Sequence, residues 1–125
     1  SRGTGKMRYI RRGEEVLFTI VPTTGLLAPT FAGGEELVSM GLSDRYRVTV
    51  SDDAAPYVAE GRSALAKFVT RAHPELRAGE EVLVEDERGA LLGVGRALLT
   101  GPEMIAFTRG VAVQIRHSRG SRTKA

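Results

Sequence analysis

Few residues of this 125-residue chain are of the types that perform chemistry, and they are scattered along it. The adjacent carboxylates of Asp52 and Asp53 could ligate a metal or work as an acid/base pair. No histidine and no third carboxylate lies near them in sequence, and aspartate is a preferred N-cap for the short helix expected at 54–60. We therefore interpret this pair as a helix cap rather than as a catalytic or metal site.

Two glycine-containing segments have part of the pattern of a functional loop. The segment 61–65 contains Ser63 but lacks the second glycine of a nucleophile elbow. The segment 93–95 lacks the third glycine, the long helix and the acidic partner of a dinucleotide-binding loop. Gly93 and Gly95 are better explained as positions where a strand bends or bulges.

The chain has two histidines, which lie in different settings. His73 precedes Pro74 in a predicted loop, where a surface or structural role is expected. His117 lies in a basic segment, where it either contacts phosphate or is solvated. Neither has the neighbours of a Ser/His/Asp triad in sequence, so we predict no catalytic residue, no metal site and no cofactor.

Basic residues are concentrated at the two ends of the chain. Residues 1–12 and 116–125 hold nine of the eighteen Lys and Arg residues and no acid, so the section between them is acidic although the net charge is +3. Basic ends are typical of proteins that neutralise nucleic-acid phosphates. The same pattern is compatible with two disordered, solubilising tails.

Composition excludes several broad classes. The absence of Cys excludes a disulfide framework and cysteine-ligated zinc, and it fits a reducing cytoplasm. No apolar run reaches the about 18–20 residues of a membrane span, and the polar start has no apolar signal-peptide core after it. A first residue other than Met indicates trimming, a tag remnant or a fragment. The absence of Asn fits a thermophilic source, and the preference for Arg over Lys a GC-rich genome.

The first third of the chain predicts a small α+β unit. Strands are expected at 7–12, 16–21 and 26–31. The third should lie at a sheet edge, because Pro29 cannot donate to a ladder. Two glycines followed by the acidic pair 35–36 predict the start of a short helix that places Leu37 and Met40 in the core and ends at Gly41.

The rest predicts a small barrel made of short strands and single-turn helices. The segment 46–50 has the alternation of a half-buried strand, and 81–85 pairs with 90–99 through a turn that needs Gly89 at positive φ. A capping box at 100–103 begins a helix at 103–107, and a last strand follows from 111. Strands linked by single-turn helices favour a barrel over βαβ units.

Several segments together resemble the PUA domain, named after pseudouridine synthases and archaeosine transglycosylases. The similar segments are 47–50, 52–63, 66–67, 79–84, 93–97, 103–104 and 109–113. The resemblance is strongest to the C-terminal module of archaeal tRNA-guanine transglycosylases. It implies an α+β fold in which a three-strand plus helix unit precedes a six-stranded pseudobarrel that binds structured RNA.

The resemblance also implies where RNA binds. In this family a glycine after the first barrel helix lies close to RNA, which corresponds to Gly61, with Arg62, Ser63 and Lys67 beside it. The last strand lies near the same face in similar domains, which adds a second group of contact residues. This group is Arg109, Arg116 and His117.

We therefore predict a non-catalytic RNA-binding module, with tRNA as the RNA, acting in tRNA modification. The expected division is a pre-PUA unit at 1–45, a PUA domain at 46–117 and a basic tail at 118–125. A catalytic subunit or domain would be the partner, in the cytoplasm, with neither membrane nor DNA involved. A translation or ribosome-associated factor with the same module is the alternative, and an enzyme would require a deep pocket with paired carboxylates or His73.

Overall fold

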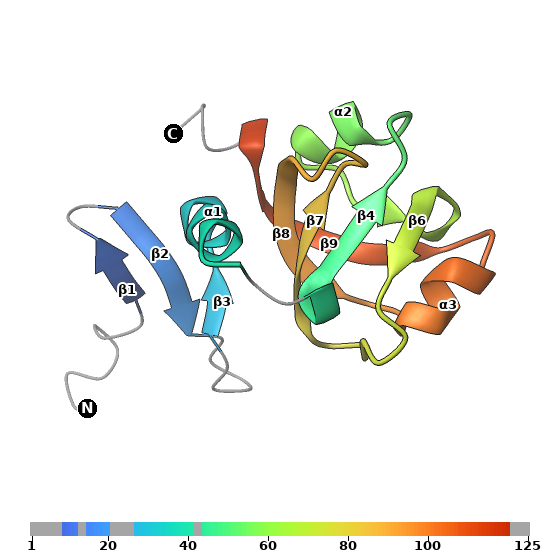
Figure 1. The fold of residues 1–125 in the computed structure, drawn as a ribbon, viewed down its shortest axis with the longest axis horizontal. Helices are drawn as coiled ribbons and strands as arrows, with labels where there is room; N and C mark the ends of the chain where they lie inside the picture. Colours follow the sequence, from blue (N-terminus) through green and yellow to red (C-terminus); the bar gives the residue numbers. More distant parts are fainter. Residues whose placement is uncertain (1–8, 13–14, 21–26, 42–43, 121–125) are drawn as a thin grey trace.

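The described part of the chain contains two β-sheets, in which most neighbouring strands are antiparallel, and several short helices (Figure 1). The computed structural model describes residues 9–12, 15–20, 27–41 and 44–120. The first sheet has three strands in the order β1-β2-β3, namely β1 (Tyr9–Arg12), β2 (Glu15–Ile20) and β3 (Leu27–Pro29). β3 lies at the edge of this sheet, as the proline in it predicts. The other residues assigned to these strands by the sequence lie outside the described residues, apart from 30–31.

Helix α1 (Phe31–Ser39) begins two residues earlier than the glycine pair predicts. Thr30 is its N-cap, and the Oγ1 atom accepts a hydrogen bond from the amide of Gly33 at 3.1 Å. Phe31 therefore belongs to the helix and not to the preceding strand. The predicted stop is confirmed, because Gly41 follows the C-cap with φ of +79°.

The core-facing side of α1 was predicted only in part. Leu37 packs against buried residues as expected, but Met40 is 74% exposed, so its predicted place in the core is wrong. The helix ends at Ser39, and Met40 as its C-cap turns away from the face that packs. The packing face lies closer to the helix start, where a Cβ on Gly34 would come within 2.7 Å of Val94 Cγ1.

The second sheet has six strands in the order β5-β9-β8-β7-β4-β6 and curls into a nearly closed barrel (Figure 1). Its strands are β4 (Arg47–Val50), β5 (Ala64–Leu65), β6 (Val69–Ala72), β7 (Glu81–Glu85), β8 (Leu91–Ala97) and β9 (Val111–Ser118). The short helices are η2 (Asp44–Tyr46), α2 (Ala55–Ala59), η3 (Ala66–Phe68) and α3 (Gly101–Ala106). The predicted fold class is therefore confirmed.

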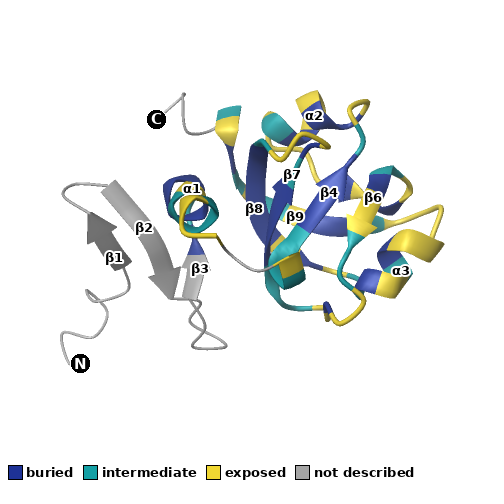
Figure 2. Ribbon diagram, in the orientation of Figure 1, coloured by how far each residue is buried: buried dark blue, intermediate teal, exposed yellow. Residues whose placement is uncertain are grey.

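Two apolar clusters hold the barrel together (Figure 2). The larger fills the interior with side chains that include Val48 and Val84, both fully buried. The smaller joins α1 to the outside of the barrel through Phe31, Leu83 and Val94. Leu83 is thus buried on the face of β7 opposite to Val84, because α1 covers that face.

Helix starts were predicted with mixed success. Thr100 and Glu103 form the expected capping box at α3, with reciprocal hydrogen bonds of 3.2 and 2.9 Å. At α2 the N-cap is Ala54 and no side chain caps the helix, so the assignment of Asp52 and Asp53 as caps is wrong. Both aspartates are exposed instead. Pro56 lies in the first turn of α2, where its missing N–H costs nothing.

The hairpin between β7 and β8 is built as the sequence predicts. Gly89 has φ of +87°, and the Oδ1 atom of Asp86 accepts hydrogen bonds from the amides of Arg88 and Ala90, both at 2.9 Å. Burial raises the pKa of Asp86, but these amides and the charges of Arg88 and Arg119 outweigh burial and leave the pKa below its ordinary value. A buried carboxylate thus adds to the backbone hydrogen bonds of this turn, in which the amide of Asp86 donates to the carbonyl of Ala90 at 3.0 Å.

No helix in the described ranges is long and apolar enough to cross a membrane. The division of the chain at residues 45 and 117 stays a prediction. β9 continues to Ser118, which is buried.

Candidate nucleic-acid interface

The loop after α2 is fixed by a Schellman motif centred on Gly61. Gly61 has φ of +109°, its amide donates to the carbonyl of Val58 at 2.9 Å, and the amide of Arg62 donates to the carbonyl of Tyr57 at 3.0 Å. Glycine is required by this backbone conformation rather than by lack of space. The expected helix stop is confirmed, but both amides are already engaged and are not free to bind a phosphate.

This loop lies against the end of the last strand. A Cβ on Gly61 would be 3.4 Å from Ser118 Oγ, and one on Gly120 would be 2.9 Å from the carbonyl oxygen of Ala59. The contact continues beyond the loop, because β5 pairs with β9 and Ala64 lies opposite Val113. The structure therefore brings the α2–β5 loop beside β9, as the predicted contact surface requires.

A groove of about 310 Å³ opens between α2 and η3. Its lining residues are Ala54, Tyr57, Val58, Arg62, Ser63, Leu65 and Phe68. Tyr57 is 58% exposed, which is unusual for an aromatic side chain on a helix that packs on a core. The lining combines buried apolar residues, such as Ala54 and Val58, with exposed polar ones, Arg62 and Ser63.

Cations stand over both aromatic rings at this groove. The guanidinium carbon of Arg62 lies 5.9 Å from the centre of the Tyr57 ring, and Lys67 Nζ lies 5.1 Å from the centre of the Phe68 ring. Neither cation has a carboxylate partner among the described residues. Aromatic faces bind unstacked bases and unpaired cations bind phosphates, so the pair of contacts suits single-stranded nucleic acid.

Arg109 lies next to the same region. It is exposed and precedes Gly110, whose carbonyl accepts the amide of Ala66 in η3 at 2.9 Å. Arg109 also has no ion pair in the part of the chain that the structure describes. Five predicted site residues, Gly61, Arg62, Ser63, Lys67 and Arg109, thus border one surface.

Arg116 and His117 have different surroundings from these five. Arg116 forms an ion pair with Glu81 of β7, and its side chain therefore reaches across β8, away from β5. Burial and the charge of Arg116 lower the pKa of His117. These surroundings favour the neutral form of the His117 ring, which attracts phosphate less than a cation does.

Tyr57, Leu65 and Phe68 are candidate contact residues that the sequence did not single out. A usable signal was present, since Lys67 precedes Phe68 directly and Tyr57 precedes Arg62 by five residues. Basic residues interleaved with aromatics indicate nucleic-acid contact. Their convergence depends on the fold, because α2 and η3 are separated by β5.

The predicted bend glycines are confirmed by their surroundings. The register between β8 and β9 shifts between Val94 and Gly95, and a Cβ on Gly95 would lie 2.0 Å from the carbonyl oxygen of Gln114. Gly95 therefore lets the backbones of β8 and β9 approach closely. Among the described residues no three His, Cys, Asp or Glu side chains are grouped as they would be around a metal ion.

Comparison with known proteins identifies the barrel. The family model of the PUA domain matches residues 46–119. The tRNA-guanine(15) transglycosylase of Methanococcus maripaludis is 37% identical over 116 residues, which are 93% of this chain and 18% of that protein. The chain thus spans about a fifth of the length of such curated relatives.

Solved structures agree with this result. A conserved PUA domain protein from Thermoplasma acidophilum superposes with a TM-score of 0.70 at 25% identity, covering 90% of this chain and 70% of that one. A chain of an H/ACA ribonucleoprotein bound to a substrate RNA superposes with a TM-score of 0.56 at 25% identity, covering 58% of this chain and 23% of that one. This chain belongs to the PUA domain family, which has an RNA-binding fold.

Proposed function

We propose that this chain is a non-catalytic tRNA-binding module that acts in tRNA modification. The observation that carries this proposal is the groove between α2 and η3, where the exposed ring of Tyr57 and the half-buried ring of Phe68 each lie near a cation that has no ion pair with any described residue. Relatives that carry the name tRNA-guanine(15) transglycosylase support tRNA as the RNA. These relatives are much longer than this chain, which supports a catalytic domain or subunit as its partner. The cytoplasm is the proposed location of both.

The proposed contact surface has a centre and a margin. At the centre, an unstacked base lies against Tyr57 and Phe68 while Arg62 and Lys67 contact the flanking phosphates. Gly61 and Ser63 allow the backbone to approach, and Arg109 extends the charged surface beyond η3. Arg116 and His117 form the margin, where Arg116 has to leave Glu81 to reach a phosphate.

We propose the same division of the chain as the sequence predicts. Within the unit at 1–45, α1 supports the barrel at 46–117 by covering its outer face at Leu83 and Val94, and the tail at 118–125 adds basic charge. In this arrangement the first unit contributes stability and position rather than RNA contacts.

The proposal is tested by binding of a tRNA transcript, measured by fluorescence anisotropy at several salt concentrations. Each lost phosphate contact flattens the slope of log K against log[salt] by about 0.7–0.9 units, so Arg62→Gln with Lys67→Gln should flatten it by about 1.4–1.8. The control pairs Arg77→Gln with Arg96→Gln, which removes the same charge from exposed sites away from the groove. Equal losses in both double variants would overturn the proposed surface.

A second measurement separates stacking from charge. Tyr57→Ala should weaken binding by about 1–3 kcal/mol without changing the salt slope, because a lost stacking contact releases no counterions. Unchanged affinity would remove Tyr57 from the interface. Co-purification with small ribosomal subunits in preference to tRNA would favour a translation factor instead.

A further inference from the structure

Exposed apolar side chains gather in the elements around η3. Among the described residues six large apolar side chains are exposed, and four of them lie on α2, β5, α3 or the residue after α3. These four are Tyr57, Leu65, Ile105 and Phe107. Tyr57 and Leu65 line the groove, whereas the other two lie outside it. Figure 2 shows that much of α3 and the α3–β9 loop, residues 107–110, is exposed. Exposed apolar side chains that gather in one region mark a contact surface.

The backbone holds the α3–β9 loop beside η3. The amide of Ala66 in η3 donates to the carbonyl of Gly110 at 2.9 Å, and helix α3 also packs against η3. Leu65, which lines the groove, pairs with Val111 at the end of the loop. Phe107 lies three residues before Gly110, so the two Cα atoms are within about 11 Å of each other. The loop is therefore a direct neighbour of the groove on the far side of Leu65 and η3.

The α3–β9 loop repeats the combination of groups found at the groove. Phe107 is 44% exposed, and Arg109, two residues later, has no ion pair with any described residue. Residues 104–113 contain no acid. Gly110 has φ of +95°, and a Cβ there would meet no atom within 4 Å, so the space over the loop is open. A protein partner could cover the apolar side chains, but cations without carboxylate partners beside them favour a polyanion.

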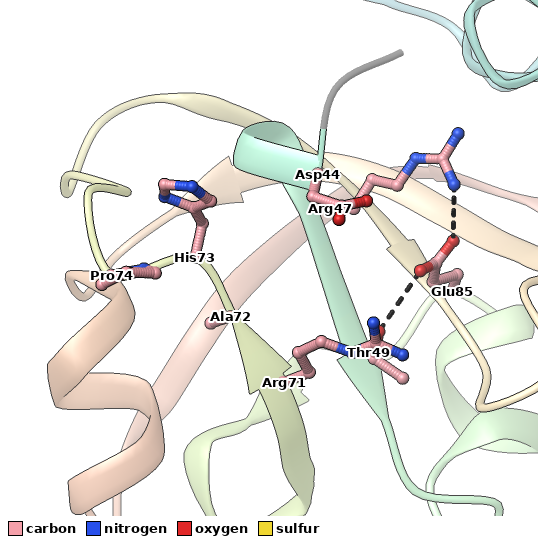
Figure 3. A pocket seen from close by; sticks show the side chains of 8 residues that line it. All are labelled: Asp44, Arg47, Thr49, Arg71, Ala72, His73, Pro74 and Glu85. Atoms are coloured by element: carbon pink, nitrogen blue, oxygen red, sulfur yellow. Dashed lines mark hydrogen bonds and ion pairs between the residues drawn. The ribbon is translucent and has the colours of Figure 1, made fainter. Parts of the chain in front are cut away.

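A second pocket, of about 160 Å³, lies on the outer face of β6, β4 and β7 and offers no such combination (Figure 3). The carboxylate of Glu85 lies between two donors, because Arg47 Nη1 is 3.6 Å from Oε1 and Thr49 Oγ1 donates to Oε2 at 3.3 Å. Figure 3 shows the side chains of Arg71 and His73 pointing apart. The cations of this pocket do not converge, so they offer a phosphate no joint contact.

We propose that Phe107 is a second base-stacking position, so that the surface takes a single RNA strand of several unpaired nucleotides. This inference rests on the proposed function, in which one unstacked base lies in the groove. From the groove the strand crosses η3, where Lys67 contacts a phosphate, and a later base stacks on Phe107. Arg109 contacts a phosphate next to that base, because it has no carboxylate to leave first. A duplex keeps its bases stacked on one another and cannot use either position.

The test measures binding of single-stranded oligoribonucleotides of about two to eight nucleotides to the full chain by fluorescence anisotropy. Wild-type affinity should rise with length until a strand reaches both aromatic positions. Phe107→Ala should leave the shortest strand unaffected and weaken binding of the longest by about five- to 150-fold, the loss expected for one base–aromatic stack. The dependence on salt should stay as in the wild type, because no phosphate contact is lost.

Ile105→Ala is the matched control, because Ile105 is an exposed apolar side chain of α3 without an aromatic face. It should bind every strand as the wild type does. Phe107→Leu should lose most of the affinity that Phe107→Ala loses, since leucine keeps apolar area but cannot stack on a base. The proposal would be overturned by wild-type affinity that does not rise with length, by equal losses at Ile105 and Phe107, or by full affinity in Phe107→Leu.

The fluorescent base 2-aminopurine gives an independent readout, because its emission changes when it stacks on an aromatic ring. Placed in turn at each position of the longest strand, it should report two separate positions in the wild type. Phe107→Ala should remove one of these signals and Tyr57→Ala the other. Weaker binding in Tyr57→Ala with full affinity in Phe107→Ala would overturn this inference and leave the proposed function intact. Unchanged binding in the groove variant with Arg62→Gln and Lys67→Gln would overturn the proposed function itself, so the two failures are separate results.

Discussion

Replacing Gly95 with alanine is expected to break the pairing of β8 with β9 and to destabilise the fold severely. The new Cβ would lie 2.0 Å from the carbonyl oxygen of Gln114 and 2.9 Å from the Cα of Ile115, and real Cβ atoms do not approach within 3.0 Å. The two backbones must therefore separate by about 1 Å, which lengthens their hydrogen bonds beyond useful range. Overpacking against movable side chains costs about 1–3 kcal/mol, and here the obstacle is backbone. We expect about 4 kcal/mol or more, which lowers Tm by about 16 °C or more.

Urea unfolding of this variant beside Gly89→Ala tests the reasoning. Gly89 has positive φ, but a Cβ there meets no atom within 4 Å, so only the left-handed backbone penalty of about 1–2 kcal/mol applies. The wild-type slope of unfolding against urea should be kept by both variants if they remain two-state. Equal destabilisation of the two variants would refute the close approach at Gln114, and with it the register of β8 on β9.

Two further predictions concern pH. Asp86→Asn should lower the free energy of unfolding at pH 7 by about 1 kcal/mol, because the charged carboxylate strengthens its hydrogen bonds from Arg88 and Ala90. The pKa of Asp86 is lower in the folded state, so its contribution is present above about pH 4 and is lost as pH falls through the folded pKa. Acid unfolding of both proteins can be followed by far-UV circular dichroism. Equal loss of stability with falling pH in the wild type and the variant would contradict this account. The pKa of His117 is also lower in the folded state, so the unfolded chain binds a proton more readily and stability should fall as pH drops below about 6.5. His117→Gln should remove part of that fall, and an NMR titration midpoint of the His117 ring at or above 6.5 would contradict the burial that lowers it.

The barrel was predictable because local signals and the resemblance agree along its length. The β7–β8 hairpin, the capping box at Thr100 and the stop at Gly61 each depend on residues close together in sequence. The failures share one cause, which is packing between distant elements. Leu83 and Phe31 are buried together because α1 covers β7, and no periodicity within either segment shows this. The start of α1 was misplaced because Thr30 provides a cap that outweighs the two glycines inside the helix.

The sequence predicted the basic residues of the candidate site but not its aromatic residues. Gly61, Arg62 and Ser63 follow from one helix stop, so their proximity could be foreseen. Tyr57 and Phe68 face one groove only because β5 returns the chain beside α2 after the Schellman turn. Such an encounter requires the three-dimensional path of the chain, which the residue pattern does not contain.

The acidic residues between the two basic ends of the chain explain which arginines remain available for phosphate. Glutamates along β7 and the turn before it engage three arginines from other elements, namely Arg45 with Glu80, Arg47 with Glu85 and Arg116 with Glu81. Arg62, Lys67 and Arg109 lie around η3, on the far side of the sheet order from β7, where no described carboxylate reaches them. An exposed ion pair contributes little stability, whereas an unpaired cation near an aromatic face is free to neutralise phosphate without first breaking a contact. This distribution of charge supports the proposed function, because the glutamates neutralise arginines near β7 and leave the cations around η3 exposed for the proposed RNA contact.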